Sequence, residues 1–161
     1  MKARVLVYGF GNPGRLDDGL GPALAQDLSG RGLGSDVMIE SGYQLAIEDA
    51  ALVAGHDVVV FADADKACRA PYELRRLEPK HGAAFTTHAV APADLLGMAH
   101  QHFGCDTLGF TLGIRGYEFN EFGEALSPRA RVNLAAAANY MDRVLRDGSL
   151  ANEAVSAHPE R

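Results

Sequence analysis

The sequence predicts an α/β fold, a three-layer sandwich in which helices cover both faces of a mostly parallel central sheet of about five strands. Two observations carry this prediction. Up to Ala62, short apolar segments alternate with segments of helical periodicity, and short glycine-containing links separate them. The apolar segments are also apolar throughout instead of alternating with polar residues, which is typical of parallel strands buried on both faces.

The first strand and helix frame a glycine-rich loop. The apolar run that contains Val5 to Tyr8 predicts a buried strand. Residues 9–14 then supply glycine, asparagine and proline, which permit a sharp reversal of the chain. Beyond this loop, Pro22 and the helical spacing of the following apolar residues predict a helix over about 19–28.

The next elements repeat this order. Residues 37–39 are a second short apolar run, and the apolar positions over about 45–53 recur at helical spacing up to Gly55. Residues 57–62, Asp-Val-Val-Val-Phe-Ala, are the most apolar strand candidate of the chain, which predicts a central position in the sheet. Asp63 follows directly at the carboxyl end of this strand.

The second half of the chain is less regular. Residues 72–77 are rich in charge, as an edge strand is, and residues 92–103 have helical spacing. Residues 107–114 resemble an interior strand, and Ser127-Pro128 opens a long terminal helix. We predict one domain over residues 1–147 and a flexible tail over residues 148–161, where the periodicity is lost.

Composition narrows the classes of function. The chain has 161 residues, 47% of them hydrophobic, and a formal net charge of −6, which disfavours nucleic acid as a partner. Cys68 and Cys105 have neither metal-ligand spacing nor a paired framework, which fits a reducing cytoplasm. No apolar span of membrane length and no export signal is apparent, so a cytoplasmic protein without membrane contact is expected.

The adjacent acids Asp17 and Asp18 admit three interpretations. The first is that they only cap the following helix, which is the commonest role of acids at such a position. The loop also matches the G-x-G-x-x-G pattern of dinucleotide sites, but Pro13 removes a backbone N–H and the two acids would repel a pyrophosphate. The third interpretation is that a carboxylate here binds a cation or a polarised group and that the glycines let a large partner approach.

A second acid and a histidine extend the third interpretation. Asp18 follows the first strand and Asp63 follows a strand expected to be its neighbour, so both should lie at the same carboxyl edge of the sheet. Converging carboxylates require a cation or a donor between them. His88, in a loop before the helix at 92–103, is the best third member among the histidines. Such a set of oxygen and imidazole ligands suits a first-row divalent metal with open positions.

The order of these segments resembles the maturation endopeptidases of nickel–iron hydrogenases. The resemblance is carried by Gly9-Phe10-Gly11-Asn12, Asp17-Asp18-Gly19-Leu20-Gly21, Glu40-Ser41-Gly42, Phe61-Ala62-Asp63-Ala64 and Thr87-His88. It implies that Asp18, Asp63 and His88 are the ligands that sense nickel, with Asp18 and Asp63 also the catalytic candidates. It further implies a reaction, removal of the carboxyl-terminal extension from a hydrogenase large-subunit precursor that already carries nickel, without an organic cofactor.

Two alternatives stay open at the level of sequence. A non-catalytic nickel-binding docking or chaperone module would use the same three ligands. The segment Gly11-Asn12-Pro13-Gly14 is also similar to the opening of peptidyl-tRNA hydrolases, although the Thr-Arg-His-Asn continuation of that family is replaced here by Leu16-Asp17-Asp18-Gly19.

Two details of the loop complete these expectations. Pro13-Gly14-Arg15 stands where the hydrogenase family often has aliphatic residues, which leaves open the hydrogenase class that supplies the substrate. Asp17 cannot point at the same metal as Asp18 from a regular helix start, and it is therefore expected to cap and orient the loop.

Overall fold

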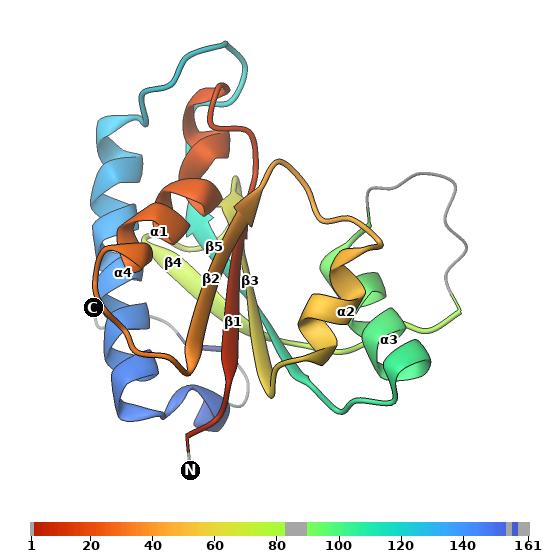
Figure 1. Ribbon diagram of the computed structural model, residues 1–161. Helices are drawn as coiled ribbons and strands as arrows, with labels where there is room; N and C mark the ends of the chain where they lie inside the picture. Colours follow the sequence, from red (N-terminus) through yellow and green to blue (C-terminus); the bar gives the residue numbers. More distant parts are fainter. Residues whose placement is uncertain (1, 83–89, 154–155, 158–161) are drawn as a thin grey trace.

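The described residues form a six-stranded sheet in the order β2-β1-β3-β5-β4-β6, covered by helices on both faces (Figure 1). The computed structural model describes residues 2–82, 90–153 and 156–157. Strands β2, β1, β3 and β5 are parallel, whereas β4 is antiparallel to β5. The predicted α/β class, with a mostly parallel sheet between two helical layers, is therefore confirmed.

The elements lie close to the segments that the periodicity predicts. The strands are β1 (Val5–Phe10), β2 (Val37–Gly42), β3 (Val58–Asp65), β4 (Tyr72–Leu77), β5 (Leu108–Arg115) and the short β6 (Ser156–Ala157). The helices are α1 (Leu20–Ser29), α2 (Asp49–Ala54), α3 (Pro92–Phe103) and α4 (Pro128–Asp147), with single turns of 3-10 helix at η1 (Leu16–Gly19) and η2 (Leu150–Asn152).

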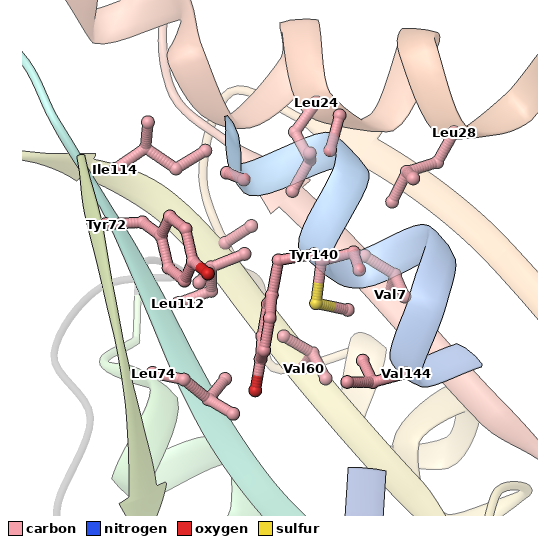
Figure 2. Close-up of a cluster of buried hydrophobic side chains, with 14 of the residues drawn as sticks. Val7, Leu24, Leu28, Val60, Tyr72, Leu74, Leu112, Ile114, Tyr140 and Val144 are labelled. Atoms are coloured by element: carbon pink, nitrogen blue, oxygen red, sulfur yellow. The ribbon is translucent and has the colours of Figure 1, made fainter. Parts of the chain in front are cut away.

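Each face of the sheet has its own apolar core. Helices α1 and α4 pack on one face, and α2 and α3 pack on the other (Figure 1). Side chains alternate between these cores along each strand, so that Val7 faces the α1/α4 side while Leu6 and Tyr8 face the α2/α3 side. In the larger core, the rings of Tyr72 and Tyr140 stack with centroids 5.0 Å apart (Figure 2). Burial on both faces explains why the central strands are apolar throughout.

Helix α2 is shorter than predicted, because it begins at Asp49 and not near residue 45. The Asp49 carboxylate accepts a hydrogen bond from the N–H of Ala46 at 2.9 Å and one from the Tyr8 hydroxyl at 3.2 Å. The Asp49 N–H itself donates to the Ala46 carbonyl, three residues earlier. A side chain that bonds its own preceding backbone holds this segment in turns and delays the helix.

The two ends of the sheet differ in how they are covered. At one end, the charged strand β4 has the predicted bounds and its outer side pairs with β6 at Leu74 and Arg75. At the other end, β2 is the outermost strand. Leu150, within the segment expected to be a tail, is only 3% exposed and belongs to the α1/α4 core. No helix in the described part of the chain combines the length and the apolar character needed to span a bilayer.

Candidate functional site

The sheet brings the carboxyl ends of β1 and β3 side by side. These strands pair in parallel, with Gly9 opposite Ala62, so the loop after β1 and the last residues of β3 share one edge. Asp18 lies in η1, directly after the loop, and Asp63 lies near the end of β3, which runs longer than predicted. The expectation that Asp18 and Asp63 meet at one edge rested on this topology.

Gly11 lies between the two acids and fixes the loop. Its φ of +141° belongs to the region that favours glycine, and a Cβ there would lie 2.2 Å from the Asp18 carbonyl oxygen and 3.6 Å from Asp63 Oδ1. Gly21 has a related role, because a Cβ there would lie 2.3 Å from the Phe10 carbonyl oxygen. The close packing of η1 and α1 against the strand ends therefore explains why glycine is required at both positions. The approach of a large partner is not needed to explain them.

Among the residues that the structure describes, one backbone N–H holds each of the Asp18 and Asp63 carboxylates. Asp18 Oδ2 accepts from the Asn12 N–H at 2.9 Å, and Asp63 Oδ1 accepts from the Ala64 N–H at 2.8 Å. Both side chains are partly exposed. Within the described residues neither carboxylate forms an ion pair, so each is positioned by the backbone but not neutralised.

This arrangement changes the acidity of Asp63. Burial, followed by the charges of Asp18 and Asp65, raises the pKa of Asp63 to about 7, although the hydrogen bond from Ala64 opposes the change. Asp63 therefore exchanges its proton close to neutral pH. A carboxyl group in this state can bind a cation or transfer a proton, which are the two roles expected of perturbed acids at functional sites.

Asp17 has the opposite surroundings. It is 0% exposed, and its carboxylate accepts hydrogen bonds from the N–H groups of Tyr117, Glu118 and Ser127 and from the Ser127 hydroxyl, at 2.7 to 3.0 Å. Burial alone would raise the pKa of Asp17, but these hydrogen bonds outweigh it and lower the pKa. Asp17 is thus turned away from the edge shared by Asp18 and Asp63, as expected, and it joins the loop to the segment before α4.

Sequence reasoning missed these partners of Asp17. The pattern Ser127-Pro128 correctly indicated a helix start, since the Ser127 side chain accepts from the Ala130 N–H at the beginning of α4. Its contact with Asp17 joins residues 110 positions apart. No local pattern marks such a contact, because it depends on how the loop and α4 pack together.

A cleft of about 340 Å³ adjoins Asp63 on the α2/α3 side of the sheet. Phe10, Phe61, Asp63, Asp65 and Thr111 are among the residues that line it. The nearby Cys68 is buried, and burial together with Asp65 raises the pKa of its thiol to about 11. This thiol is thus protonated at neutral pH, which disfavours a cysteine nucleophile at this edge.

The third predicted ligand, His88, lies outside the described residues. In the described ranges 2–82, 90–153 and 156–157, no group of three or more His, Cys, Asp or Glu side chains is arranged to hold a metal ion. The structure therefore brings Asp18 and Asp63 to one edge of the sheet and leaves the place of His88 a prediction.

Solved structures with the same fold include maturation proteases of nickel–iron hydrogenases. HycI from Thermococcus kodakarensis KOD1 matches with a TM-score of 0.71 and 23% identity over 90% of this chain and 94% of that one. HybD from E. coli matches with a TM-score of 0.65 and 21% identity, covering 93% of this chain and 91% of that one. A hydrogenase 2 maturation peptidase from a Thaumarchaeota archaeon matches with a TM-score of 0.63 and 22% identity, covering 88% of this chain and 97% of that one.

These likenesses confirm the resemblance at the level of the fold. Neither a protein-family model nor a curated protein sequence matches the chain. The match extends over about nine-tenths of the chain, so the shared fold is that of nearly the whole chain.

Proposed function

We propose that this chain, which has the fold of nickel–iron hydrogenase maturation proteases, is itself such an endopeptidase. Its substrate is the precursor of a hydrogenase large subunit that already carries nickel, and its reaction removes the carboxyl-terminal extension of that precursor. In this proposal the enzyme acts in the cytoplasm and requires no organic cofactor.

One observation carries this proposal beyond the fold. Asp18 and Asp63 converge at the carboxyl edge of adjacent parallel strands, held by backbone N–H groups but not neutralised within the described residues. In open α/β sheets this edge is where ligands bind. The raised pKa of Asp63, about 7, indicates that the fold tolerates an unfavourable carboxylate there. A cation carried by the substrate would remove this cost.

In this proposal the nickel of the substrate is the recognition element. Asp18, Asp63 and His88 occupy the open positions of a nickel ion held by the precursor, a ligand set of oxygen and imidazole that suits a first-row divalent metal. Only three protein ligands are available, so the isolated protein binds metal weakly and the precursor completes the coordination shell. This dependence restricts cleavage to precursors that have been loaded with nickel.

The two acids also serve the hydrolysis. Cleavage adds the hydroxyl of a water molecule to the carbonyl carbon of the scissile bond and a proton to the leaving amine. In the metal-free protein the pKa of Asp63 is about 7. Coordination to the nickel of the substrate would lower this pKa, so in the complex Asp63 would act as a carboxylate that accepts a hydrogen bond from the attacking water and orients it. In the metal-free protein, burial raises the pKa of Asp63 most, and the charge of Asp18 adds to this effect.

The decisive experiment is an incubation of the purified protein with a hydrogenase large-subunit precursor, prepared with and without nickel. Mass spectrometry should detect the released carboxyl-terminal peptide only with the nickel-loaded precursor. His88→Ala should abolish the release and leave the melting temperature unchanged, whereas the exposed His102 on α3 provides a matched control, His102→Ala, that should cleave normally.

The alternatives give different results in the same experiment. A protein that binds the loaded precursor without releasing a peptide is a docking or chaperone module. Release from the nickel-free precursor at an equal rate would contradict recognition through nickel. A peptidyl-tRNA hydrolase would act on neither precursor and would instead require an RNA substrate, which an acidic chain is poorly suited to bind.

A further inference from the structure

A groove of about 610 Å³ lies between α1 and β2. On one side it is lined by α1 residues that include Gln26 and Ser29, and on the other by Ile39, Glu40 and Ser41 of β2. This groove is separate from the cleft beside Asp63, which opens on the α2/α3 side. Its size falls within the usual range of binding pockets.

The wall formed by β2 is an open edge of the sheet. Strand β2 is outermost in the strand order and pairs with β1 on one side only. In the described part of the chain, no other strand pairs with its outer side. An edge of this kind presents backbone N–H and C=O groups to which an extended peptide can add as a further strand.

One end of the groove lies beside the loop that precedes Asp18. Gly19 and Pro13, which flank Asp18 and its loop, line one end of it, and Ser29 at the carboxyl end of α1 lines the other. Helix α1 has 10 residues, which corresponds to about 15 Å at the usual rise per residue. About four to five residues of extended chain span that length.

The negative charge of the groove favours a positively charged ligand. Glu40 and Glu124 both line it and are exposed, whereas none of its described lining residues is Lys, Arg or His. Two carboxylates in a groove with no cationic residue among its described lining favour positively charged side chains in whatever lies between them. The remaining lining is small or uncharged, including Ala23, Gln26 and Ser41, and so offers room for an extended backbone.

We propose that this groove binds an extended, positively charged segment of the protein substrate, which lies along β2 and delivers the scissile bond to Asp18 and Asp63. The proposal rests on the proposed function and names the part of the substrate that the protein holds besides the nickel. Glu40 and Glu124 contact the cationic side chains of the segment. The backbone of β2 contributes contacts that do not depend on sequence.

The first test measures binding without cleavage. Two eight-residue peptides of alternating threonine and valine are compared, one with arginine and the other with glutamate at two internal positions. In nuclear magnetic resonance titrations of the whole chain, the arginine peptide should shift the amide signals of Ile39, Glu40 and Ser41 and bind about tenfold more tightly than the glutamate peptide. Added salt should reduce this preference.

Charge reversal provides the matched variants. The double variant Glu40→Lys/Glu124→Lys should reverse the preference between the two peptides, whereas Glu78→Lys, an exposed control beyond β4, should not change it. Equal binding of both peptides, or shifts confined to residues outside the groove, would overturn the proposal. Concentration-dependent dimers that protect the β2 amides would identify a second copy of the chain as the occupant and would also overturn it.

The second test separates this proposal from the proposed function. With nickel-loaded precursor, Glu40→Gln/Glu124→Gln should raise KM about tenfold and leave kcat and the melting temperature unchanged. If the wild-type chain cleaves no precursor but binds the arginine peptide along β2, the proposed function is contradicted, whereas binding of a cationic segment in the groove is supported. If the wild-type chain cleaves the precursor and the double variant has an unchanged KM, the groove proposal fails alone.

Discussion

Asp17 and Asp63 follow strands that end at the same edge of the sheet, yet their surroundings are opposite. Asp17 is fully buried, accepts four hydrogen bonds and has a lowered pKa. Asp63 is partly exposed, accepts one hydrogen bond within the described part of the chain, from the Ala64 backbone, and has a pKa raised to about 7. The fold supplies Asp17 with hydrogen-bond donors that stabilise its charge, whereas it places Asp63 where the charged form is unfavourable.

This contrast separates a structural acid from a functional one. Buried polar groups are nearly always paired, so the four donors around Asp17 are what a purely architectural carboxylate requires. A carboxylate kept close to another acid without a cation is instead typical of sites that bind a ligand or exchange protons. Substitutions at the two acids and at their partners test the contrast, beginning with the largest expected effect.

Asp17→Ala should lower the free energy of unfolding by about 3–5 kcal/mol, because it removes a buried carboxylate and leaves the surrounding hydrogen-bond donors without an acceptor. This loss is larger than the roughly 1 kcal/mol expected for a simple helix cap. Chemical denaturation monitored by circular dichroism measures it. A loss below about 1 kcal/mol would show that the Asp17 network is not an anchor of the fold.

Ser127→Ala removes only part of the hydrogen-bond network around Asp17. It removes the hydroxyl that donates to Asp17 and accepts from Ala130, but it keeps the backbone N–H that donates to Asp17. The expected loss is about 1–2 kcal/mol, which is intermediate between wild type and Asp17→Ala. If both variants lose the same free energy, the hydroxyl rather than the carboxylate is the centre of this contact.

Asp18→Asn should reduce the cleavage of nickel-loaded precursor at least about 100-fold, or about 2.7 kcal/mol of transition-state stabilisation, with little change in stability. The amide oxygen can still accept from the Asn12 N–H, so the loop keeps its shape while the charge is lost. Parallel melting and cleavage assays measure both effects. Normal cleavage by this variant, together with inactive but stable Asp17→Ala, would reverse the roles of the two acids.

Asp63→Asn should stabilise the protein above neutral pH. Because the pKa of Asp63 is about 7 in the folded chain and 3.8 for an unperturbed aspartate, the folded chain binds the proton more tightly, and stability falls as pH rises between these values. The variant lacks this dependence and, after allowance for solvent screening, should gain about 1–2 kcal/mol at pH 8 and nothing at pH 3. Denaturation in the presence of a chelator measures it, and a destabilised variant at pH 8 would refute the account.

Much of the fold followed from the sequence because its determinants are local. The bounds of α3 and β4 agree with their sequence patterns, and Ser127 caps α4 as its position before Pro128 indicates. The start of α2 did not follow, since Asp49 bonds the backbone of Ala46 and the hydroxyl of Tyr8 on another element. Helical periodicity contains no information about such a contact.

The candidate site followed from the sequence in outline only. The order of elements places Asp18 and Asp63 at one edge because parallel strands share their carboxyl ends. Which of the two adjacent acids faces that edge was only an expectation before the partners of Asp17 were visible. The role of His88 remains a prediction that the cleavage experiment tests.

The sequence by itself determined the layered α/β architecture and the edge at which its acids converge, since periodicity, glycine-rich links and strand order are properties of neighbouring residues. Only the tertiary structure decided how each acid is used. Hydrogen bonds from residues about 100 positions away make Asp17 an anchor, and the combination of burial with the charge of Asp18 raises the pKa of Asp63. Such surroundings arise from packing between distant segments, so no local pattern can encode them.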